Sequence, residues 1–378
     1  MREASVIGDR SINLGPQSQP QVERASLPHT DQRRLHIICE RDVGLFSLIQ
    51  QVIANIPWAV SEGRIPVVYF GQRTCYWNPN GYGDRDTVWE YYFDPIVPEH
   101  PVSSIPVDVL AAIESRPPGM FEIGCEIGDG AIASANFGDH PALRTKCLQI
   151  PYLYDDPDGE LRRVASALIR AYVRPRDWIA EKADCFYRDM LSGRYVIGVN
   201  IRGTDAVSPG ERRPFRKGSL RLPRFRQEIR KHMATHPDAR IFIATDDERS
   251  LAYMRRAFGD RVVAYGSIRH TGGGAAGRGP TGMLMPAYVA GDRDVASRNG
   301  EEAIIESLLL GRCQHLIHNG SSLARTVLLS EPDLPHTNTH RRPTPFRRSL
   351  ERLLSLAWLR GHPHVSAAGP APAEYKVR

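Results

Sequence analysis

The sequence predicts an α/β protein made of two Rossmann-like domains that face each other across a cleft, each with a mostly parallel sheet. Three observations predict this class. Strands and helices alternate over residues 35–70 and again over residues 195–330, the order that gives parallel sheets. The chain has 378 residues, enough for two domains of ordinary size. Its 41% apolar and 24% charged residues are typical of globular proteins.

The first alternating run follows a polar N-terminal segment. Residues 1–32 show no apolar period, so we expect a flexible arm. Residues 35–39 form an apolar run typical of a buried strand. A helix is predicted from Gly44, because apolar residues recur at helical spacing. Pro57 is expected to kink or break this helix, and residues 65–70 are predicted to form the next strand.

An aromatic-rich segment comes next, over residues 71–95. A packed loop is favoured there over a stacking wall for a sugar, because aromatic side chains are large and usually buried. Residues 96–150 show little periodicity, and no element is predicted in them.

The second alternating run begins with helices over residues 161–190, broken at Pro175. A strand at residues 195–199 then runs into Asn200, Arg202 and Asp205. Strands are predicted at residues 239–244, 261–265 and 313–318, and helices at residues 222–234, 249–258, 299–310 and 323–330. Two acids, Glu301 and Glu302, are expected in the first turn of the helix at 299–310.

The net charge of +6 comes from the C-terminal tail, because residues 338–378 hold eight Lys/Arg and two acids. A generally basic surface for nucleic acid is therefore not indicated. The tail also carries an apolar stripe beside arginines between Phe346 and Arg360. This pattern predicts either a helix that contacts an anionic membrane or one that docks back on the protein, and docking is slightly favoured.

Other signals exclude several classes of protein. No apolar stretch is long enough to span a membrane, and residues 1–18 lack the apolar core of a signal peptide. We therefore expect a cytoplasmic protein that is membrane-associated only if the tail binds lipid. The six cysteines form no CxxC pair, which favours buried thiols. Residues 271–280 are Gly-rich but match neither GxxxxGK[ST] nor GxGxxG, so a flexible loop is expected and a nicotinamide-dependent enzyme is disfavoured.

Polar residues follow the predicted strands of the second half. Asn200, Arg202 and Asp205 follow the strand at 195–199, and further groups follow or lie one element away from the next strands: Thr245, Asp246, Asp247, Glu306, Ser321 and Ser322. Ligands bind at the carboxyl ends of parallel strands. A guanidinium there suits a diphosphate, and serines at a helix start suit an anion. The alternative is that Arg202 and Asp205 simply pair and cap the loop.

Three segments in this order resemble the family of NodZ-like and α1,6-fucosyltransferases, with a more distant likeness to protein O-fucosyltransferases. Residues 197–205 are similar to the family's strand and HxRxxD-type motif, and residues 243–247 to its A-T-D-D strand end. Glu306 followed by Ser321 and Ser322 is similar to its acid and Ser-Ser spacing. Residues 44–47 and 63–68 resemble its glycine turn and following strand, so the likeness spans about residues 35–335.

The resemblance implies a GT-B-like fold and an inverting, metal-independent glycosyltransferase with no cofactor. Its partners are GDP-fucose as donor substrate and a glycan or glycoconjugate as acceptor. Arg202 would grip the β-phosphate, and the serines would bind phosphate. Gly44 would let backbone approach the phosphates. The remaining nucleotide-site residues would be Asn200, Asp246, Asp247 and Glu306.

Three differences from the family bear on catalysis. Asn200 replaces a His, Glu306 replaces an Asp, and Gly210 stands where the α1,6 enzyme has its catalytic Glu. Glu211 is the nearest acid and is the candidate base, with Arg202 and Asp205 as the other candidate catalytic residues. The alternative is a catalytically impaired nucleotide-binding or scaffold protein that keeps the fold.

The predicted organisation therefore has four parts. An arm covers residues 1–32, an N-terminal acceptor-side domain residues 33–180, and a C-terminal nucleotide-sugar domain residues 181–337. The basic tail covers residues 338–378.

Overall fold

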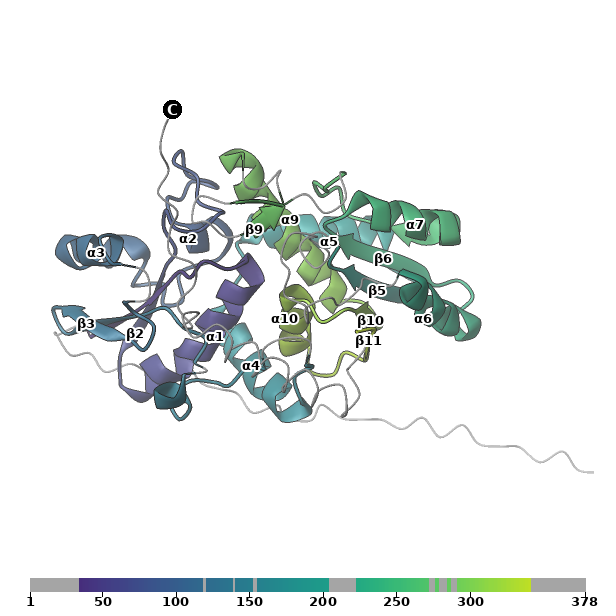
Figure 1. The fold of residues 1–378 in the computed structure, drawn as a ribbon. Helices are drawn as coiled ribbons and strands as arrows, with labels where there is room; N and C mark the ends of the chain where they lie inside the picture. Colours follow the sequence, from purple (N-terminus) through teal and green to yellow (C-terminus); the bar gives the residue numbers. More distant parts are fainter. Residues whose placement is uncertain are drawn as a thin grey trace, which may run out of the picture.

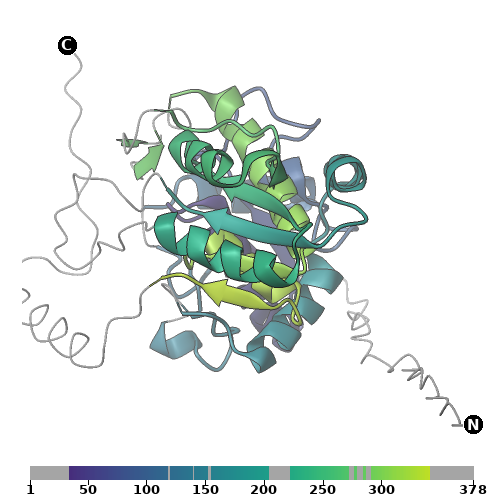
Figure 2. The same cartoon turned by 90° about the vertical axis from the view of Figure 1, so that its right-hand side faces the viewer.

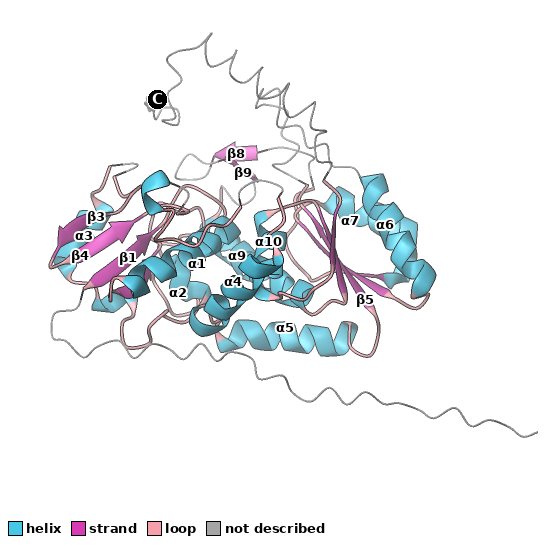
Figure 3. Cartoon of the chain, turned by 90° about the horizontal axis from the view of Figure 1, so that it is seen from below, coloured by secondary structure: helices cyan, strands magenta, loops and turns pink. Residues whose placement is uncertain are grey.

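The computed structural model describes residues 34–117, 120–138, 140–151, 155–203, 222–271, 276–278, 284–286 and 291–340. Within these ranges the chain forms two mostly parallel sheets with helices between them (Figure 1 and Figure 3). The predicted α/β class is confirmed. The arm at 1–32 and the stripe at 346–360 lie outside the described residues.

The N-terminal sheet has the strand order β2-β1-β4-β3. Its strands are β1 (Leu35–Cys39), β2 (Ile65–Tyr69), β3 (Cys125–Gly128) and β4 (Ala131–Ser134). Strand β1 is parallel to both β2 and β4, and β3 is antiparallel to β4. Strand β1 is buried along its whole length, as expected for a parallel strand covered on both faces.

Helix α1 (Leu45–Ser61) joins β1 to β2 and confirms the predicted β–α–β unit. A break of this helix at Pro57 is not found, because α1 continues past that residue to Ser61. Proline removes one hydrogen bond of the helix. The residues on either side, Ile56 and Trp58, are buried, so packing of the helix outweighs that loss.

The region at 96–150, left without a prediction, completes the first sheet. Helix α3 (Val107–Glu114) covers the face of the sheet opposite α1, and a hairpin joins β3 to β4. Asp129 and Gly130 have positive φ angles of 50° and 68° in that hairpin. An Asp-Gly pair is typical of a tight hairpin turn, so the signal was present in the sequence.

Helices α4 (Gly159–Tyr172) and α5 (Asp177–Met190) connect the two sheets and confirm the break predicted at Pro175. The domain boundary proposed at residues 180 and 181 falls inside α5. Helix α4 packs against α10 (Ser322–Ser330), and α5 packs against α9 (Arg293–Gly311).

The second sheet has the strand order β11-β10-β5-β6-β7, and every neighbouring pair is parallel. Strand β5 (Val196–Ile201) is in the middle (Figure 2). The others are β6 (Arg240–Thr245), β7 (Val262–Val263), β10 (His315–His318) and β11 (His336–Asn338). Helices α6 (Leu222–Thr235) and α7 (Glu248–Phe258) cover one face, and α9 covers the other. A separate two-stranded antiparallel sheet is formed by β8 (Ala276–Arg278) and β9 (Leu284–Pro286), and β8 falls in the segment 271–280 where a flexible loop was expected.

Helix α9 starts six residues before the predicted start at 299. Asp292 is its N-cap and accepts hydrogen bonds from the backbone of Asp294 and Val295. Glu301 and Glu302 therefore lie in the interior of the helix and not in its first turn, which corrects the prediction. The predicted start at 299 rested on the two acids that follow Gly300, whereas in the structure Gly300 lies within the helix and makes room for the hydroxyl of Tyr92.

The aromatic segment at 71–95 is packed, as favoured from the sequence. Trp89, Tyr91 and Tyr92, all on the short helix α2 (Val88–Tyr92), are fully buried. The Tyr92 hydroxyl donates a hydrogen bond of 2.7 Å to the carbonyl of Ser297 on α9. The segment thus ties the first sheet to a helix of the second. Among the described residues, no helix is both long enough and apolar enough to cross a membrane.

Candidate functional site

The topology of the second sheet creates a switch point between β5 and β10. The chain leaves β5 toward β6 on one side, whereas β10 lies on the other side of β5 and continues to β11. The loops after β5 and β10 therefore diverge, and the carboxyl ends of such a strand pair are the usual ligand site in open α/β sheets. Asn200, Arg202, Ser321 and Ser322 all come from these two strand ends.

The two loops are fastened together by Asn319. Its side-chain oxygen accepts from the backbone N–H of Arg202 at 3.2 Å, and its side-chain nitrogen donates to the Arg202 carbonyl at 3.1 Å. The backbone of Arg202 is thus fixed to the end of β10. Its side chain stays 43% exposed at the edge of the sheet.

Asp246 approaches Arg202 from the other neighbouring strand, β6. Its carboxylate lies 3.6 Å from Arg202 Nε and accepts a 2.7 Å hydrogen bond from the backbone of Gly203. Asp247 is instead the N-cap of α7, where its carboxylate accepts hydrogen bonds from the backbone N–H and the hydroxyl of Ser250. Asp246 therefore faces the candidate site, whereas Asp247 stabilises the helix behind it.

The Ser321 hydroxyl is already used within the protein. It donates to the Asn200 side-chain oxygen at 2.6 Å and accepts from the backbone of Ala324 at 3.1 Å as the N-cap of α10. Asn200 also donates a long bond, 3.5 Å, to the Ala244 carbonyl. The Asn200–Ser321 pair thus locks the start of α10 against β5.

Helices α1 and α10 bring their N-termini together across the two sheets. The hydroxyls of Ser47 and Ser322 lie 2.9 Å apart, and Gln50 donates to the Ser322 carbonyl at 2.8 Å. Gly44 is the N-cap of α1, gives no side-chain cap, and has nothing within 4 Å of where a Cβ would lie. Two helix N-termini, each the positive end of a dipole, suit an anion near this point.

Glu306 lies behind the sheet edge, on α9, and is 6% exposed. Its carboxylate accepts from the Ser267 hydroxyl at 2.7 Å and from Arg269 at 3.4 Å. Burial raises the pKa of Glu306 to about 7, although Arg269 opposes the shift. The group therefore fastens the loop after β7, which continues along Asp246 through a 3.0 Å bond from the backbone of His270.

The raised pKa of Glu306 predicts a pH-dependent stability. The pKa of this carboxyl group is 4.5 in its ordinary state and about 7 in the folded protein. Between pH 4.5 and about 7, Glu306 therefore keeps a proton in the folded protein that it has lost in the unfolded chain. The stabilisation is complete below 4.5 and is lost as the pH rises through 7. We expect the free energy of unfolding to fall by on the order of 3 kcal/mol between pH 5 and 8 from this group. Urea unfolding at several pH values measures it, and Glu306→Gln should remove this part of the slope; parallel profiles would contradict it.

The structure brings together at one edge most of the nucleotide-site residues that the sequence suggested: Gly44, Asn200, Arg202, Asp246, Ser321 and Ser322. Glu306 lies one layer behind. Asp205 and Glu211 lie outside the described residues. Asn319, Ser47 and Gln50 were not among the site residues predicted from the sequence. The Asn319-Gly320 pair is a turn signal that marks the loop, and Ser47 ends the segment 44–47 that resembles the family's glycine turn. Nothing in the sequence distinguishes Gln50 from other helix residues.

One group of possible metal ligands occurs among the described residues. Asp156, His318 and His336 offer ligand atoms within 4.8 Å of one another. However, the other ring nitrogen of His318, Nδ1, accepts a 3.1 Å hydrogen bond from the backbone N–H of Gly320. A metal-bound histidine usually donates from that second nitrogen. The cluster therefore does not suit a metal while this hydrogen bond is present.

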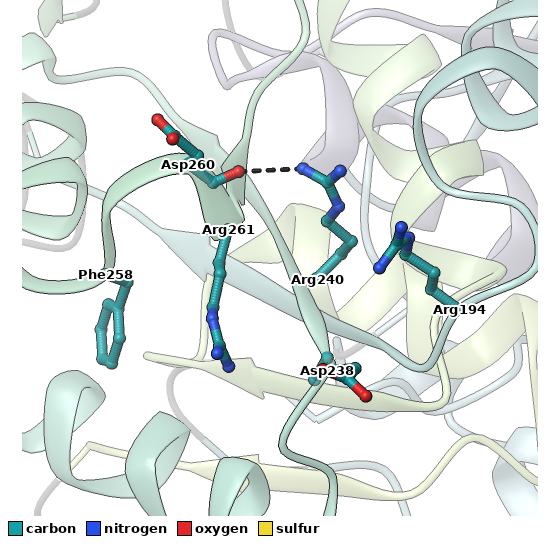
Figure 4. Close-up of a pocket in the computed structure, with 7 residues that line it drawn as sticks. Arg194, Asp238, Arg240, Phe258, Asp260 and Arg261 are labelled. Carbon is teal, nitrogen blue, oxygen red and sulfur yellow. Dashed lines mark hydrogen bonds between the residues drawn. The ribbon is translucent and has the colours of Figure 1, made fainter.

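A hollow of about 360 Å³ lies at the opposite, amino edge of the second sheet (Figure 4). It is lined by Arg194, Asp238, Ala239, Arg240, Phe258, Asp260 and Arg261. Arg240 donates to the Asp260 carbonyl at 2.9 Å, and Arg261 to the carbonyl of Pro237. Arg240 and Arg261 thus fasten loops, and the hollow is at the end of the sheet away from Arg202.

The fold and the edge of its second sheet define an α/β protein with two mostly parallel sheets and polar side chains at a switch point. The sequence matches no protein-family model and no curated protein. Among solved structures, the chain is similar to NodZ α-1,6-fucosyltransferase soaked with GDP-fucose. The identity is 19% and the TM-score 0.48, covering 79% of this chain and 92% of that one. It is also similar to fucosyltransferase NodZ from Bradyrhizobium, at 17% identity and a TM-score of 0.48, with 81% of this chain and 96% of that chain covered. The chain is also similar to POFUT1 in complex with GDP-fucose. The identity is 14% and the TM-score 0.46, with 83% of this chain and 99% of that chain covered.

Proposed function

We propose that this protein is an inverting, metal-independent glycosyltransferase that transfers fucose from GDP-fucose to a glycan or glycoconjugate acceptor. The observation that carries the proposal is the setting of Arg202. Its backbone is held by Asn319 at the switch point, and its partly exposed guanidinium faces a carboxylate from the next strand. The choice of GDP-fucose rests on the sequence motifs around Arg202, Asp246 and Ser321.

In this proposal Arg202 binds the β-phosphate with its planar fork and stabilises the diphosphate as it leaves. Asp246, 3.6 Å from its Nε, orients the guanidinium. Ser322 is the better phosphate ligand of the two serines, because its hydroxyl shares one hydrogen bond with Ser47, whereas the Ser321 hydroxyl both donates to Asn200 and accepts from Ala324. The N-termini of α1 and α10 supply further N–H donors.

Charge on the leaving diphosphate would be balanced by Arg202 and the helix N-termini, which is why we propose metal independence. Inversion requires the acceptor hydroxyl to attack the face of the sugar opposite the diphosphate. Asp205 and Glu211 remain the proposed catalytic acids, with Glu211 as general base. Contacts of Asp247 and Glu306 with the nucleotide also remain predictions.

One observation favours a second candidate, a nucleotide-binding protein without transfer activity. The Asn200 side chain is engaged by Ser321 and by the Ala244 carbonyl, so it has less capacity to serve a substrate. This candidate predicts GDP binding without sugar transfer or donor hydrolysis. A membrane contact through residues 341–378 remains a prediction.

Calorimetric titration with GDP, UDP, ADP, GDP-fucose and GDP-mannose in the presence of EDTA tests the proposal. We expect selective binding of GDP and GDP-fucose, followed by release of GDP from GDP-fucose when a glycan mixture is added. Binding without turnover would favour the second candidate. The absence of any nucleotide binding would overturn both.

Gly44 gives a prediction that separates binding from folding. Its φ of −67° is open to any residue, and a Cβ there would meet nothing within 4 Å. We expect Gly44→Leu to change the free energy of unfolding by no more than about 1 kcal/mol. It should weaken GDP binding by about tenfold or more, because a large side chain at the N-terminus of α1 would take up space that the proposal gives to the phosphates.

The control is Gly159→Leu, an exposed glycine in the first turn of α4. That variant should bind GDP like the wild type. Equal GDP affinity in the wild type and the Gly44→Leu variant would remove Gly44 from the site.

A further inference from the structure

His318 is the last residue of β10 and has no role in the proposed transfer reaction. It is 1% exposed and pairs in register with Asn200 on β5. Its Nδ1 accepts a hydrogen bond from the backbone N–H two residues later, that of Gly320, at 3.1 Å. This is the bond of an Asx turn, in which an Asn or Asp oxygen accepts the N–H at i+2, with an imidazole nitrogen in place of the oxygen.

The bond to Gly320 fixes the protonation of the ring. Because Nδ1 is the acceptor, the proton of the neutral imidazole is on Nε2. Burial lowers the pKa of His318 to about 4, so the ring is neutral near pH 7. Nε2 has no hydrogen-bond partner among the described residues, and it lies 3.7 Å from the Asp156 carboxylate. Asp156 is itself held by Asn338 at 2.9 Å, so its negative charge faces the protonated side of the ring.

The turn that His318 closes contains residues that position the candidate site. Asn319, next in the chain, clamps the backbone of Arg202. Gly320 has a φ of +78°, which a glycine adopts without strain. Ser321 caps α10 and bonds Asn200. Loss of the Gly320 bond would free this turn and leave a buried ring nitrogen and a backbone N–H unpaired.

We propose that His318 is a positioning residue of the nucleotide site, whose Nδ1 sets the turn that holds Arg202 and the start of α10. That this site binds a nucleotide rests on the proposed function, whereas the role of His318 in the turn does not. Asp156, on the segment that leads into α4, favours the tautomer in which Nδ1 is free to accept.

A matched pair of variants, His318→Asn and His318→Leu, tests this. Asparagine and leucine have nearly the same shape, and both remove the ring, so the two variants should lose similar packing. Only the His318→Asn variant offers a side-chain oxygen to the backbone N–H of Gly320.

We expect hydrogen exchange in peptides spanning residues 316–326 to be about tenfold faster in His318→Leu, and to stay near the wild-type rate in His318→Asn. GDP affinity should fall about tenfold in the leucine variant and less than threefold in the asparagine variant. Equal exchange and equal affinity in the two variants would overturn the proposal.

Two further readouts separate this inference from the proposed function. If the wild-type protein binds no nucleotide, the proposed function fails, but exchange in the two variants still decides the role of His318. Nitrogen-15 spectra of labelled histidine should show Nδ1 of His318 unprotonated at pH 7. Stabilisation by zinc that is lost in His336→Ala would overturn the proposal, because a metal on Nε2 would move the proton to Nδ1.

Discussion

Replacing Arg202 with alanine is expected to weaken binding of GDP by about 10- to 150-fold, the range for a hydrogen bond to a charged group. The rate of sugar transfer should fall by about 10²–10³, as for loss of one donor to a developing oxyanion. The fold should be kept, because the Asn319 side chain is bonded to the backbone of Arg202, which the substitution does not remove. Calorimetry and assays of GDP release measure the two effects.

The second sheet offers a matched control at the other end of the same strand. Arg194 is exposed two residues before β5 and lines the hollow at the amino edge of the sheet (Figure 4). Arg194→Ala removes a side chain of the same type from the opposite edge of the sheet and should leave GDP binding unchanged. Arg202→Lys keeps the charge but loses the planar fork, so an intermediate loss is expected. Equal affinities in all three variants and the wild type would exclude Arg202 from the site.

Replacing Arg116 with leucine is expected to cost about 3–5 kcal/mol of stability, the usual result of leaving a buried charge unpaired. The Arg116 and Glu40 side chains are 5% and 2% exposed and form an ion pair of 3.1 Å. Glu40 follows β1 directly and begins the loop to Gly44, so the pair supports the entry to α1. Since domains are commonly stable by about 5–15 kcal/mol, urea unfolding should show a large shift of the midpoint.

Two variants establish that the buried charge is the cause. Adding Glu40→Gln to Arg116→Leu should recover more than half of the lost stability, because the orphaned carboxylate is then neutral. Arg188→Leu, which breaks an exposed pair with Asp189, should cost less than about 1 kcal/mol. If the double variant is no more stable than Arg116→Leu, packing and not charge explains the loss.

The local elements were predictable where one physical signal dominated. Strands β1, β5 and β6 are mostly apolar and almost wholly buried, and their limits were predicted to within one or two residues. The break between α4 and α5 followed from Pro175. The start of α9 was misplaced because its prediction rested on the two acids that follow Gly300, whereas in the structure Gly300 lies within the helix and accommodates Tyr92.

The candidate site was predictable as a set of residue types but not as a set of roles. Arg202 and the two serines were identified because they follow strands. The Ser321 hydroxyl is engaged by Asn200, which is 121 positions away in the sequence. The partners of Glu306 could not be predicted from the sequence either. Arg269 and Ser267 contact it from a loop, where the apolar residues show no regular spacing.

The sequence by itself determined the α/β class, the parallel pairing of β1 with β2, and the strand ends on which polar residues gather. These follow from apolar runs and turn residues, which are local signals along the chain. Only the tertiary structure decided that β10 lies beside β5, that α1 and α10 meet at their N-termini, and that His318 closes the turn beside Arg202. Those contacts join residues more than 100 positions apart or depend on the burial of a single ring, and the local pattern of residues does not encode either.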